Sequence, residues 1–197
     1  MRLITLLAMA LGLAVMTATA SANHPMTSPV EDRYLPKPCI TLQHFEQFGD
    51  ALQAAMVLSF VGDGIPMIYN GQEAGNPQRL QFFEKDPIAW RKHPNGALYA
   101  DLTALKKKTN ALWNGEWGAM MVHVPNDKFA QVLSFVRQDA NGKVFAVFNL
   151  SPTAQKVRFE QTLYHGVYTE HFSRKSATLD ASTALELKPW EYRVFVR

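Results

Sequence analysis

Residues 129–150, FAQVLSFVRQDANGKVFAVFNL, decide the fold of the second half of the chain. The segments 129–137 and 143–150 are rich in β-branched and aromatic residues, a composition typical of strands. Asn141 and Gly142 lie between them, and an Asn-Gly pair between two strands is a strong signal for a tight antiparallel turn. The stretch therefore predicts a β-hairpin.

The sequence around this hairpin repeats the same pattern. Further short segments with strand composition occupy residues 119–124, 155–160, 166–172, 184–187 and 191–197, and turn signals such as Ser151-Pro152 separate them. Seven short strands over about 80 residues are typical of an antiparallel sandwich with its own core. We expect this β-sandwich to occupy residues 117–197.

Residues 45–61 have a different period. Apolar side chains recur at helical spacing, which predicts an amphipathic helix with these positions on one face: Phe45, Phe48, Leu52, Ala55, Met56, Ser59 and Phe60. Gly62 and Gly64 end it. The apolar run at 65–69, IPMIY, lies between glycines and predicts a short strand buried on both faces, as in a parallel sheet.

A second helix is predicted over residues 98–113, after a polar loop at 70–95. Its apolar face carries Leu98, Leu102, Leu105 and Leu112, with Trp113 expected in the core and the lysines at 106–108 on the opposite, solvated face. Helix, glycine stop and buried strand together form half of a β/α repeat. Because one strand cannot close a barrel, we expect this half to dock on the sandwich through Phe45, Phe48, Leu52, Leu105 and Leu112, with self-association as a further possibility.

The amino-terminal residues indicate export. Residues 1–22 combine Arg2, an apolar stretch and the Ala20-Ser21-Ala22 cleavage signal, which predicts a signal peptide and a periplasmic or extracellular protein. Residues 23–41 contain four prolines and predict an extended arm. Cys39 is the only cysteine, so it is either a buried thiol or a link to a second chain.

The charge of the chain excludes some partners. Lysine and arginine number 20 against 17 acidic residues, and the net charge of +3 is spread along the sequence. Nucleic-acid and membrane-surface binding need a concentrated basic patch. We therefore expect no nucleic-acid partner, and no membrane partner once the signal peptide is removed.

Several motifs resemble the α-amylase family, glycoside hydrolase family 13. Residues 64–73, GIPMIYNGQE, are similar to the last barrel strand and its loop; residues 48–51 are similar to the preceding barrel helix and residues 79–90, RLQFFEKDPIAW, to the loop after the eighth strand. Residues 98–113 are similar to the final barrel helix, and 144–151 with 187–196 to the carboxy-terminal sandwich, domain C. The resemblance implies an α+β fold, in which a partial β/α-barrel of two helices and one buried strand (42–116) precedes an antiparallel β-sandwich (117–197).

The family cleaves α-glucosidic bonds with retention, using an aspartate, a glutamate and a second aspartate that follow the fourth, fifth and seventh strands. Retention requires two carboxyl groups about 5 to 5.5 Å apart. We find no segment before Phe45 that matches those strands, so no member of the triad is assigned here. Glu73 is the one remaining candidate for a catalytic carboxylate.

Substrate-binding candidates lie at and after the predicted strand, because barrel active sites form at the carboxyl ends of strands. They are Tyr69, Gln72, Glu73, Phe82 and Trp90, whose aromatic rings could cover the apolar face of a sugar. The alternative is that Gln72 and Glu73 only hydrogen-bond neighbouring loops. No metal site is predicted, although calcium is common in the family.

Two functional classes follow from these observations. The first is a secreted, truncated α-amylase-like protein that acts on or binds α-1,4-glucans such as starch and maltooligosaccharides. The alternative is a non-catalytic carbohydrate-binding or accessory module. A gene fragment without a selected role is a third interpretation, and the sequence leaves open whether the chain is an enzyme.

Overall fold

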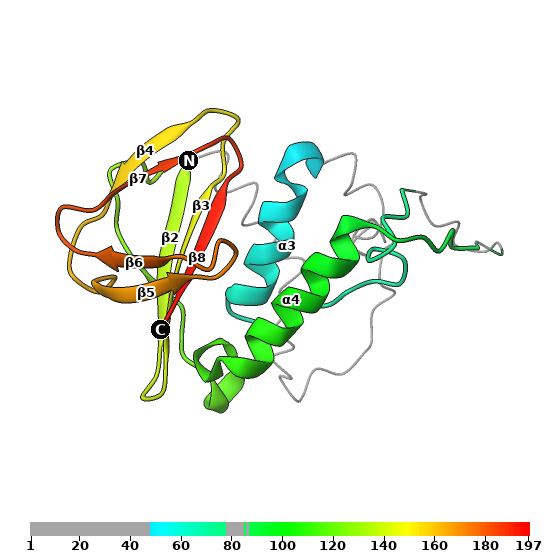
Figure 1. The fold of residues 1–197 in the computed structure, drawn as a ribbon, viewed down its shortest axis with the longest axis horizontal. Coiled ribbons are helices and arrows are strands. Elements are labelled where there is room, and N and C mark those ends of the chain that lie inside the picture. Colours follow the sequence, from blue (N-terminus) through cyan, green and yellow to red (C-terminus); the bar gives the residue numbers. More distant parts are fainter. Residues whose placement is uncertain (1–47, 78–84, 86) are drawn as a thin grey trace, which may run out of the picture.

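The computed structural model of the chain describes residues 48–77, 85 and 87–197 (Figure 1). The predicted signal peptide (1–22) and the predicted arm (23–41) lie outside the described residues, as do Cys39, Phe45 and Phe82. The helical elements, in which η marks a 3₁₀ turn, are η2 (Gly49–Ala51), α3 (Leu52–Val61), α4 (Pro94–Lys108), η3 (Asn110–Leu112) and η4 (Gly115–Trp117).

Helix α3 confirms the first predicted helix from Leu52 onward, and the turn before it is 3₁₀. The helix ends where the glycines predict, because the Gly62 N–H donates to the Leu58 carbonyl at 2.9 Å. A β-carbon at position 62 would lie 2.9 Å from that carbonyl oxygen, so any larger residue would crowd the Leu58 carbonyl and glycine does not. No helix among the described residues has the length and apolar character needed to cross a bilayer.

Helix α4 begins four residues before the predicted start at Leu98 and confirms the second helix as far as Lys108. Pro94 occupies its first turn, where a missing N–H costs nothing, and the His93 side chain accepts from the Asn95 N–H at 3.2 Å. At Thr109 the backbone becomes extended, with φ −111° and ψ 99°, before η3 resumes. Leu102, Leu105 and Leu112 are buried as predicted.

The predicted buried strand at residues 65–69 is wrong. This segment has no regular secondary structure, and Ile65 and Met67 are 78% and 69% exposed. A strand buried on both faces needs pairing partners at its edges and layers above and below it. The strands of the described residues all lie between Val122 and Val196, so nothing in this part of the chain supplies those neighbours.

The second half of the chain is the predicted antiparallel sandwich. A six-stranded sheet has the order β1-β2-β3-β8-β5-β6, and a two-stranded sheet contains β4 and β7. Strand β6 was not predicted, since its Ser-Ala-Thr-Leu sequence is short and has only one large apolar residue. The strands are β1 (Val122–His123), β2 (Val132–Gln138), β3 (Lys143–Asn149), β4 (Gln155–Arg158), β5 (Gly166–Glu170), β6 (Ser176–Leu179), β7 (Ala184–Leu187) and β8 (Tyr192–Val196).

The hairpin that the sequence predicts connects β2 to β3. Its register runs from Val132 opposite Asn149 to Gln138 opposite Lys143. Asp139 closes the turn, because its Oδ1 accepts hydrogen bonds from the N–H groups of Asn141 at 2.8 Å and Gly142 at 2.7 Å. The Asn-Gly prediction is confirmed.

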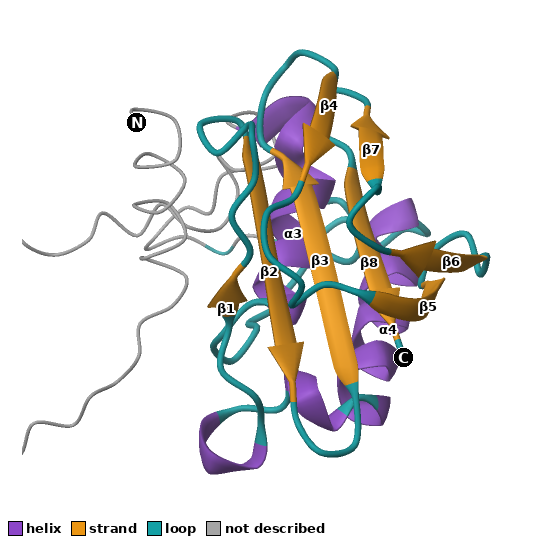
Figure 2. Ribbon diagram, turned by 90° about the vertical axis from the view of Figure 1, so that its left-hand side faces the viewer, coloured by secondary structure: helices purple, strands orange, loops and turns teal. Residues whose placement is uncertain are grey.

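The large sheet separates two apolar cores, because alternate residues along a strand point to opposite faces. On one face, Phe145 and Phe195 pack against the small sheet. On the other, Phe135 and Phe148 pack against α3 and α4, which lie behind the sheet in Figure 2.

The predicted docking of the helices on the sandwich is confirmed. Leu105 and Leu112 belong to the helix-side core, Leu52 packs against it, and Phe48 is half-buried. Burying each such side chain is worth about 1.5 to 3 kcal/mol. This core crosses the predicted boundary at residue 116, so the helices and the sandwich are one packed unit. The α+β architecture of two helices followed by an antiparallel sandwich is therefore as the sequence predicts.

Candidate functional site

The turn at residues 69–76 brings three of the predicted binding residues together. The Gln72 side-chain oxygen accepts from the Tyr69 N–H at 2.9 Å and from the Tyr99 hydroxyl at 3.3 Å. Glu73 accepts from the Gly71 N–H through its Oε2 at 3.0 Å. Both side chains thus fix the shape of their own turn, and Gln72 also ties it to Tyr99 of α4.

Glycines and a distant arginine complete this turn. Gly75 has φ +62°, and a β-carbon there would lie 2.5 Å from the His93 ring, so both conformation and space require glycine. Arg91 donates to the carbonyl oxygens of Ala74 at 3.2 Å and Gly75 at 2.8 Å. The segment that precedes α4 is thereby tied to the turn.

Two predicted aromatic residues of the site, Tyr69 and Trp90, have exposed side chains. Trp90, next to Arg91 in the chain, is 61% exposed, and Tyr69 is 37% exposed. Phe82 lies outside the described residues. Exposed rings beside a turn with fixed amide and carboxylate groups have the chemistry to contact a sugar, with the rings against C–H groups and the polar atoms near hydroxyls.

The surroundings of Tyr99 keep its hydroxyl protonated, so that it acts as a hydrogen-bond donor. Burial, with the nearby Glu73 carboxylate, raises the pKa of Tyr99 to about 12. The hydroxyl therefore stays protonated at neutral pH and keeps donating to Gln72. Within the described residues, the hydrogen bonds of Glu73 join it to no second carboxylate.

The described ranges contain no group of three or more His, Cys, Asp and Glu side chains that could hold a metal ion. These residues thus provide no carboxylate cluster that fits a calcium ion.

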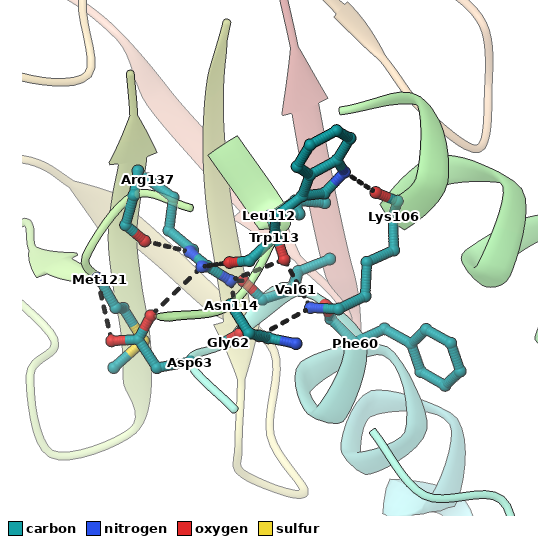
Figure 3. A network of polar contacts seen from close by, with 11 residues as sticks. Phe60, Val61, Gly62, Asp63, Lys106, Leu112, Trp113, Asn114, Met121 and Arg137 are labelled. Atoms are coloured by element: carbon teal, nitrogen blue, oxygen red, sulfur yellow. Dashed lines mark hydrogen bonds and ion pairs between the residues drawn. The ribbon is translucent and has the colours of Figure 1, made fainter. Parts of the chain in front are cut away.

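A second polar site, which the sequence did not predict, surrounds Arg137 on β2 (Figure 3). Arg137 is 2% exposed and lies 3.4 Å from the Asp63 carboxylate. Its guanidinium donates to five backbone carbonyl oxygens: Ala119 (2.7 Å), Gly62 (2.7 Å), Trp113 (2.6 Å), Val61 (3.4 Å) and Leu112 (3.4 Å). These carbonyls include the ends of α3 and η3, which lack partners within their own helices.

Lys106 extends the same network from α4. Its ammonium group donates to the Leu112 carbonyl at 2.5 Å, the Phe60 carbonyl at 3.3 Å and the Asn114 side chain at 3.3 Å. Burial, together with the charge of Arg137 and against that of Asp63, lowers the pKa of Lys106 to about 8. The expectation that the lysines of this helix face solvent is therefore wrong for Lys106. We call Arg137 and Lys106 the carbonyl clamp.

The expectation that Trp113 is a core residue is also wrong. Its side chain is 39% exposed, and its indole N–H donates to the Lys106 carbonyl at 3.0 Å. Because the helix is interrupted at Thr109, Trp113 does not continue the leucine face of α4. Trp113 contacts Lys106 of the carbonyl clamp and does not fill the core.

A third polar cluster joins α4 to the end of β5. The ring of His171, which is buried, lies 2.6 Å from the Asp101 carboxylate, and Arg174 donates to the other oxygen of Asp101 at 2.9 Å. Like the clamp, this cluster links the helices to the sandwich.

Comparison with known proteins gives the class of the carboxy-terminal part of the chain. Residues 124–190 match the family model described as the α-amylase C-terminal all-β domain. This segment is therefore such a domain, and the resemblance to the carboxy-terminal part of the α-amylase family is confirmed. No curated protein matches the chain.

Solved structures share the fold. The noncanonic maltogenic α-amylase AmyB from Thermotoga neapolitana has a TM-score of 0.64 and 18% identity, over 75% of this chain and 36% of that chain. A cyclomaltodextrinase has a TM-score of 0.62 and 14% identity, over 80% and 28%. An Anoxybacillus α-amylase has a TM-score of 0.55 and 18% identity, over 73% and 31%. The chain thus spans about a third of the length of these enzymes.

Proposed function

We propose that this protein is a secreted, α-amylase-type chain whose described part binds α-1,4-glucans such as starch and maltooligosaccharides, and does not itself cleave them. The observation that carries the proposal is the α-amylase C-terminal domain at residues 124–190, which shares one core with two helices. Tyr99 of that core donates to Gln72 in the turn at 69–76. Similar solved structures include enzymes named maltogenic amylase and cyclomaltodextrinase, which supports a glucan as the ligand.

The turn at 69–76 supports binding. Gln72 and Glu73 are held in place by backbone N–H groups and by Tyr99, so their remaining hydrogen-bonding capacity is fixed in direction. Tyr69 in the turn is exposed, as is Trp90, which precedes the Arg91 that donates to Ala74 and Gly75. A fixed polar group beside an aromatic face suits a pyranose, which has hydroxyls on its rim and C–H groups on its faces.

The same turn argues against hydrolysis at this place. Retaining cleavage needs a nucleophilic carboxylate and a protonated carboxylic acid about 5 to 5.5 Å apart. Glu73 accepts from the Gly71 N–H, and no hydrogen bond in the described part of the chain joins it to a carboxylate partner. A lone carboxylate can bind a hydroxyl but can perform only half of this reaction.

Affinity electrophoresis in gels that contain amylopectin tests the proposal. The wild-type chain should be retarded relative to a gel without polysaccharide, and Trp90→Ala should lose most of that retardation. Trp117→Ala is the matched control, because Trp117 is 69% exposed but lies in η4, away from the turn in sequence. Equal mobility of wild type and Trp90→Ala in both gels would contradict the proposal.

Export is the second part of the proposal, and the signal-like residues 1–22 support it. Expression of the full chain in a bacterial host should place a shortened product, beginning at Asn23, in the periplasm or medium. Mass spectrometry of the fractions measures this, and an uncleaved cytoplasmic chain would contradict it.

The exposed apolar segment at 65–69 supports self-association as the third part. Exposed contiguous apolar side chains usually mark a contact surface, and Ile65 and Met67 are both largely exposed. Light scattering over a range of concentrations should show a dimer whose fraction falls in Met67→Glu. An unchanged monomer at every concentration would contradict this part.

A further inference from the structure

A groove of about 920 Å³ lies between the large sheet and the start of α3, apart from the turn at 69–76. Its walls come from η2 and α3, from the end of β5 through β6, and from the segment that leads into β8. The starts of α3 and β8 lie at the same end of the molecule in Figure 1, and the Tyr192 hydroxyl donates to the Gln53 side chain at 3.4 Å across this gap. Its size falls within the range of small-molecule sites, about 300 to 1,000 Å³.

Aromatic side chains form one part of this groove. Phe172 and Tyr192 meet edge to face with ring centroids 5.1 Å apart, and Trp190, two residues before Tyr192, lines the same groove. The Trp190 side chain is partly buried. Rings that are anchored by packing and still reach a groove can cover an apolar ligand face.

The backbone at Trp190 is unusual. Its φ is +57°, a left-handed conformation that a bulky residue seldom adopts, and its N–H donates to the Ser151 carbonyl at 3.2 Å. Strained non-glycine residues of this kind concentrate at ligand sites, where the surrounding structure holds them. Trp190 is therefore the residue of this groove segment that we consider first as a ligand contact.

Polar side chains around the rings are held in fixed orientations. Glu191 accepts from the Arg193 Nε at 3.0 Å and from the Lys188 N–H at 2.7 Å. Gln53 accepts from the Tyr192 hydroxyl, and this bond sets the orientation of its amide group. Fixed planar amide, carboxylate and guanidinium groups suit the paired hydroxyls of a sugar.

Glu170 contributes a buried carboxylate to the groove. It accepts from the N–H groups of Phe172 at 3.3 Å, Ser173 at 2.7 Å and Val194 at 3.4 Å. Although burial acts to raise its pKa, hydrogen bonds from Ser173, Phe172 and Val194 lower the pKa below the usual value. The carboxylate is therefore ionised at neutral pH.

The charges of the groove favour a neutral ligand. Three acidic side chains, Asp50, Glu170 and Glu191, line it together with two basic ones, Lys175 and Arg193. An anionic ligand such as a phosphate would meet carboxylates, and a cationic ligand would meet the basic pair. A neutral ligand with many hydroxyls meets no such repulsion.

We propose that this groove is a second carbohydrate site, which binds a glucosyl unit of an α-1,4-glucan against Trp190 and hydrogen-bonds its hydroxyls through Gln53, Glu191 and Arg193. The proposal rests on glucan binding by this chain. It adds a site that is separate from the turn at 69–76 and that lies on the sandwich itself. Two sites on one rigid unit would also strengthen attachment to a long polysaccharide.

Isothermal titration of the full chain with maltoheptaose tests the groove. Two sites are expected for the wild type, one for Trp190→Ala and one for Trp90→Ala. Gln53→Ala should weaken the groove site by about tenfold, since one hydrogen bond to the ligand is lost while the exposed start of α3 keeps its fold. Trp117→Ala is the control that should bind as the wild type does, and thermal melting verifies that each variant is folded.

The outcomes separate the two proposals. Two-site binding by folded Trp190→Ala, or unchanged affinity at both sites in folded Gln53→Ala, would overturn the groove. A wild-type single site that Trp90→Ala alone abolishes would also overturn it. A single site that survives in Trp90→Ala and is lost in Trp190→Ala would support the groove while overturning the turn at 69–76. Absence of any binding by the wild type would overturn both.

Discussion

Arg137 is a charged side chain in a strand that is otherwise buried, and its partners explain why it is tolerated. A guanidinium has five N–H donors, and here they reach five carbonyl oxygens and the Asp63 carboxylate. A buried charge is costly unless it is paired and hydrogen-bonded. The partners come from α3 and from the segment after α4, so the same side chain fixes how the helices meet the sheet.

Replacing Arg137 should therefore destabilise the protein strongly. Arg137→Leu removes the donors and leaves the carbonyls of Gly62 and Trp113 buried without them, so the free energy of unfolding should fall by about 3 to 5 kcal/mol. Urea denaturation measures this. Lys156→Ala is the control, because the exposed Lys156–Glu186 pair (62% and 78% exposed) contributes at most about 1 kcal/mol. An unchanged midpoint in Arg137→Leu would contradict the role of the clamp.

Lys106 gives the clamp a pH dependence. Its pKa is about 8 in the folded chain and 10.5 in the unfolded reference, so between these values the unfolded state binds more protons. Stability contributed by this group is present above about pH 10.5 and is lost as the pH falls through 8. From pH 8 to 10, wild-type stability should rise relative to that of Lys106→Met, as measured by urea unfolding at each pH. Parallel pH profiles would argue against a lowered pKa at this residue.

At the scale of elements, helix α4 is held to the sandwich by its leucine face. Leu105 is 6% exposed and lies in the core with Phe148 and Val194. Leu105→Ala should lower the free energy of unfolding by about 2 to 5 kcal/mol, because a cavity remains between helix and sheet. Met120→Ala, at a residue 81% exposed, should change it by no more than about 0.5 kcal/mol. Equal melting temperatures for Leu105→Ala and the wild type would show that the helix does not depend on this core.

Elements with local signals could be predicted from the sequence. Asn141 and Gly142 specify the turn between β2 and β3, and the leucine spacing specifies the face of α4. The segment at 65–69 could not be predicted correctly, because a buried strand depends on neighbours that its own residues do not encode. Strand β6 was missed because its short sequence has only one large apolar residue and resembles a loop.

The candidate site shows the same limit. Gln72 and Glu73 could be identified because they follow an apolar run, but their partner Tyr99 is 27 residues away from Gln72 and had no signal of its own. The clamp joins Arg137 to Gly62 over 75 residues. The groove at Trp190 is assembled from several separate segments, so its residues had no common pattern in the sequence.

At the scale of the whole molecule, one sheet serves two cores. Phe135 and Phe145 lie on adjacent strands but face opposite cores, so loss of either core exposes the sheet. Thermal unfolding should therefore be one cooperative transition, with far-ultraviolet and near-ultraviolet circular dichroism giving the same midpoint. Separate midpoints would show that helices and sandwich unfold independently.

The distribution of side chains over the whole molecule also bears on its chemistry. Three carboxylates of the described residues, Glu73, Glu170 and Asp139, accept hydrogen bonds from backbone N–H groups. Rings at Trp90 and Trp190 remain open to a ligand. This arrangement suits a chain that holds a glucan and leaves its linkages intact.

The most direct test of this account is to incubate the purified chain with maltoheptaose, measure binding by titration calorimetry, and then analyse the recovered sugar by chromatography. The account predicts saturable binding with maltoheptaose recovered intact. Shorter maltooligosaccharides produced by the wild type and absent with Glu73→Gln would contradict it, because a working carboxylate would then lie in the turn that we assign to binding alone.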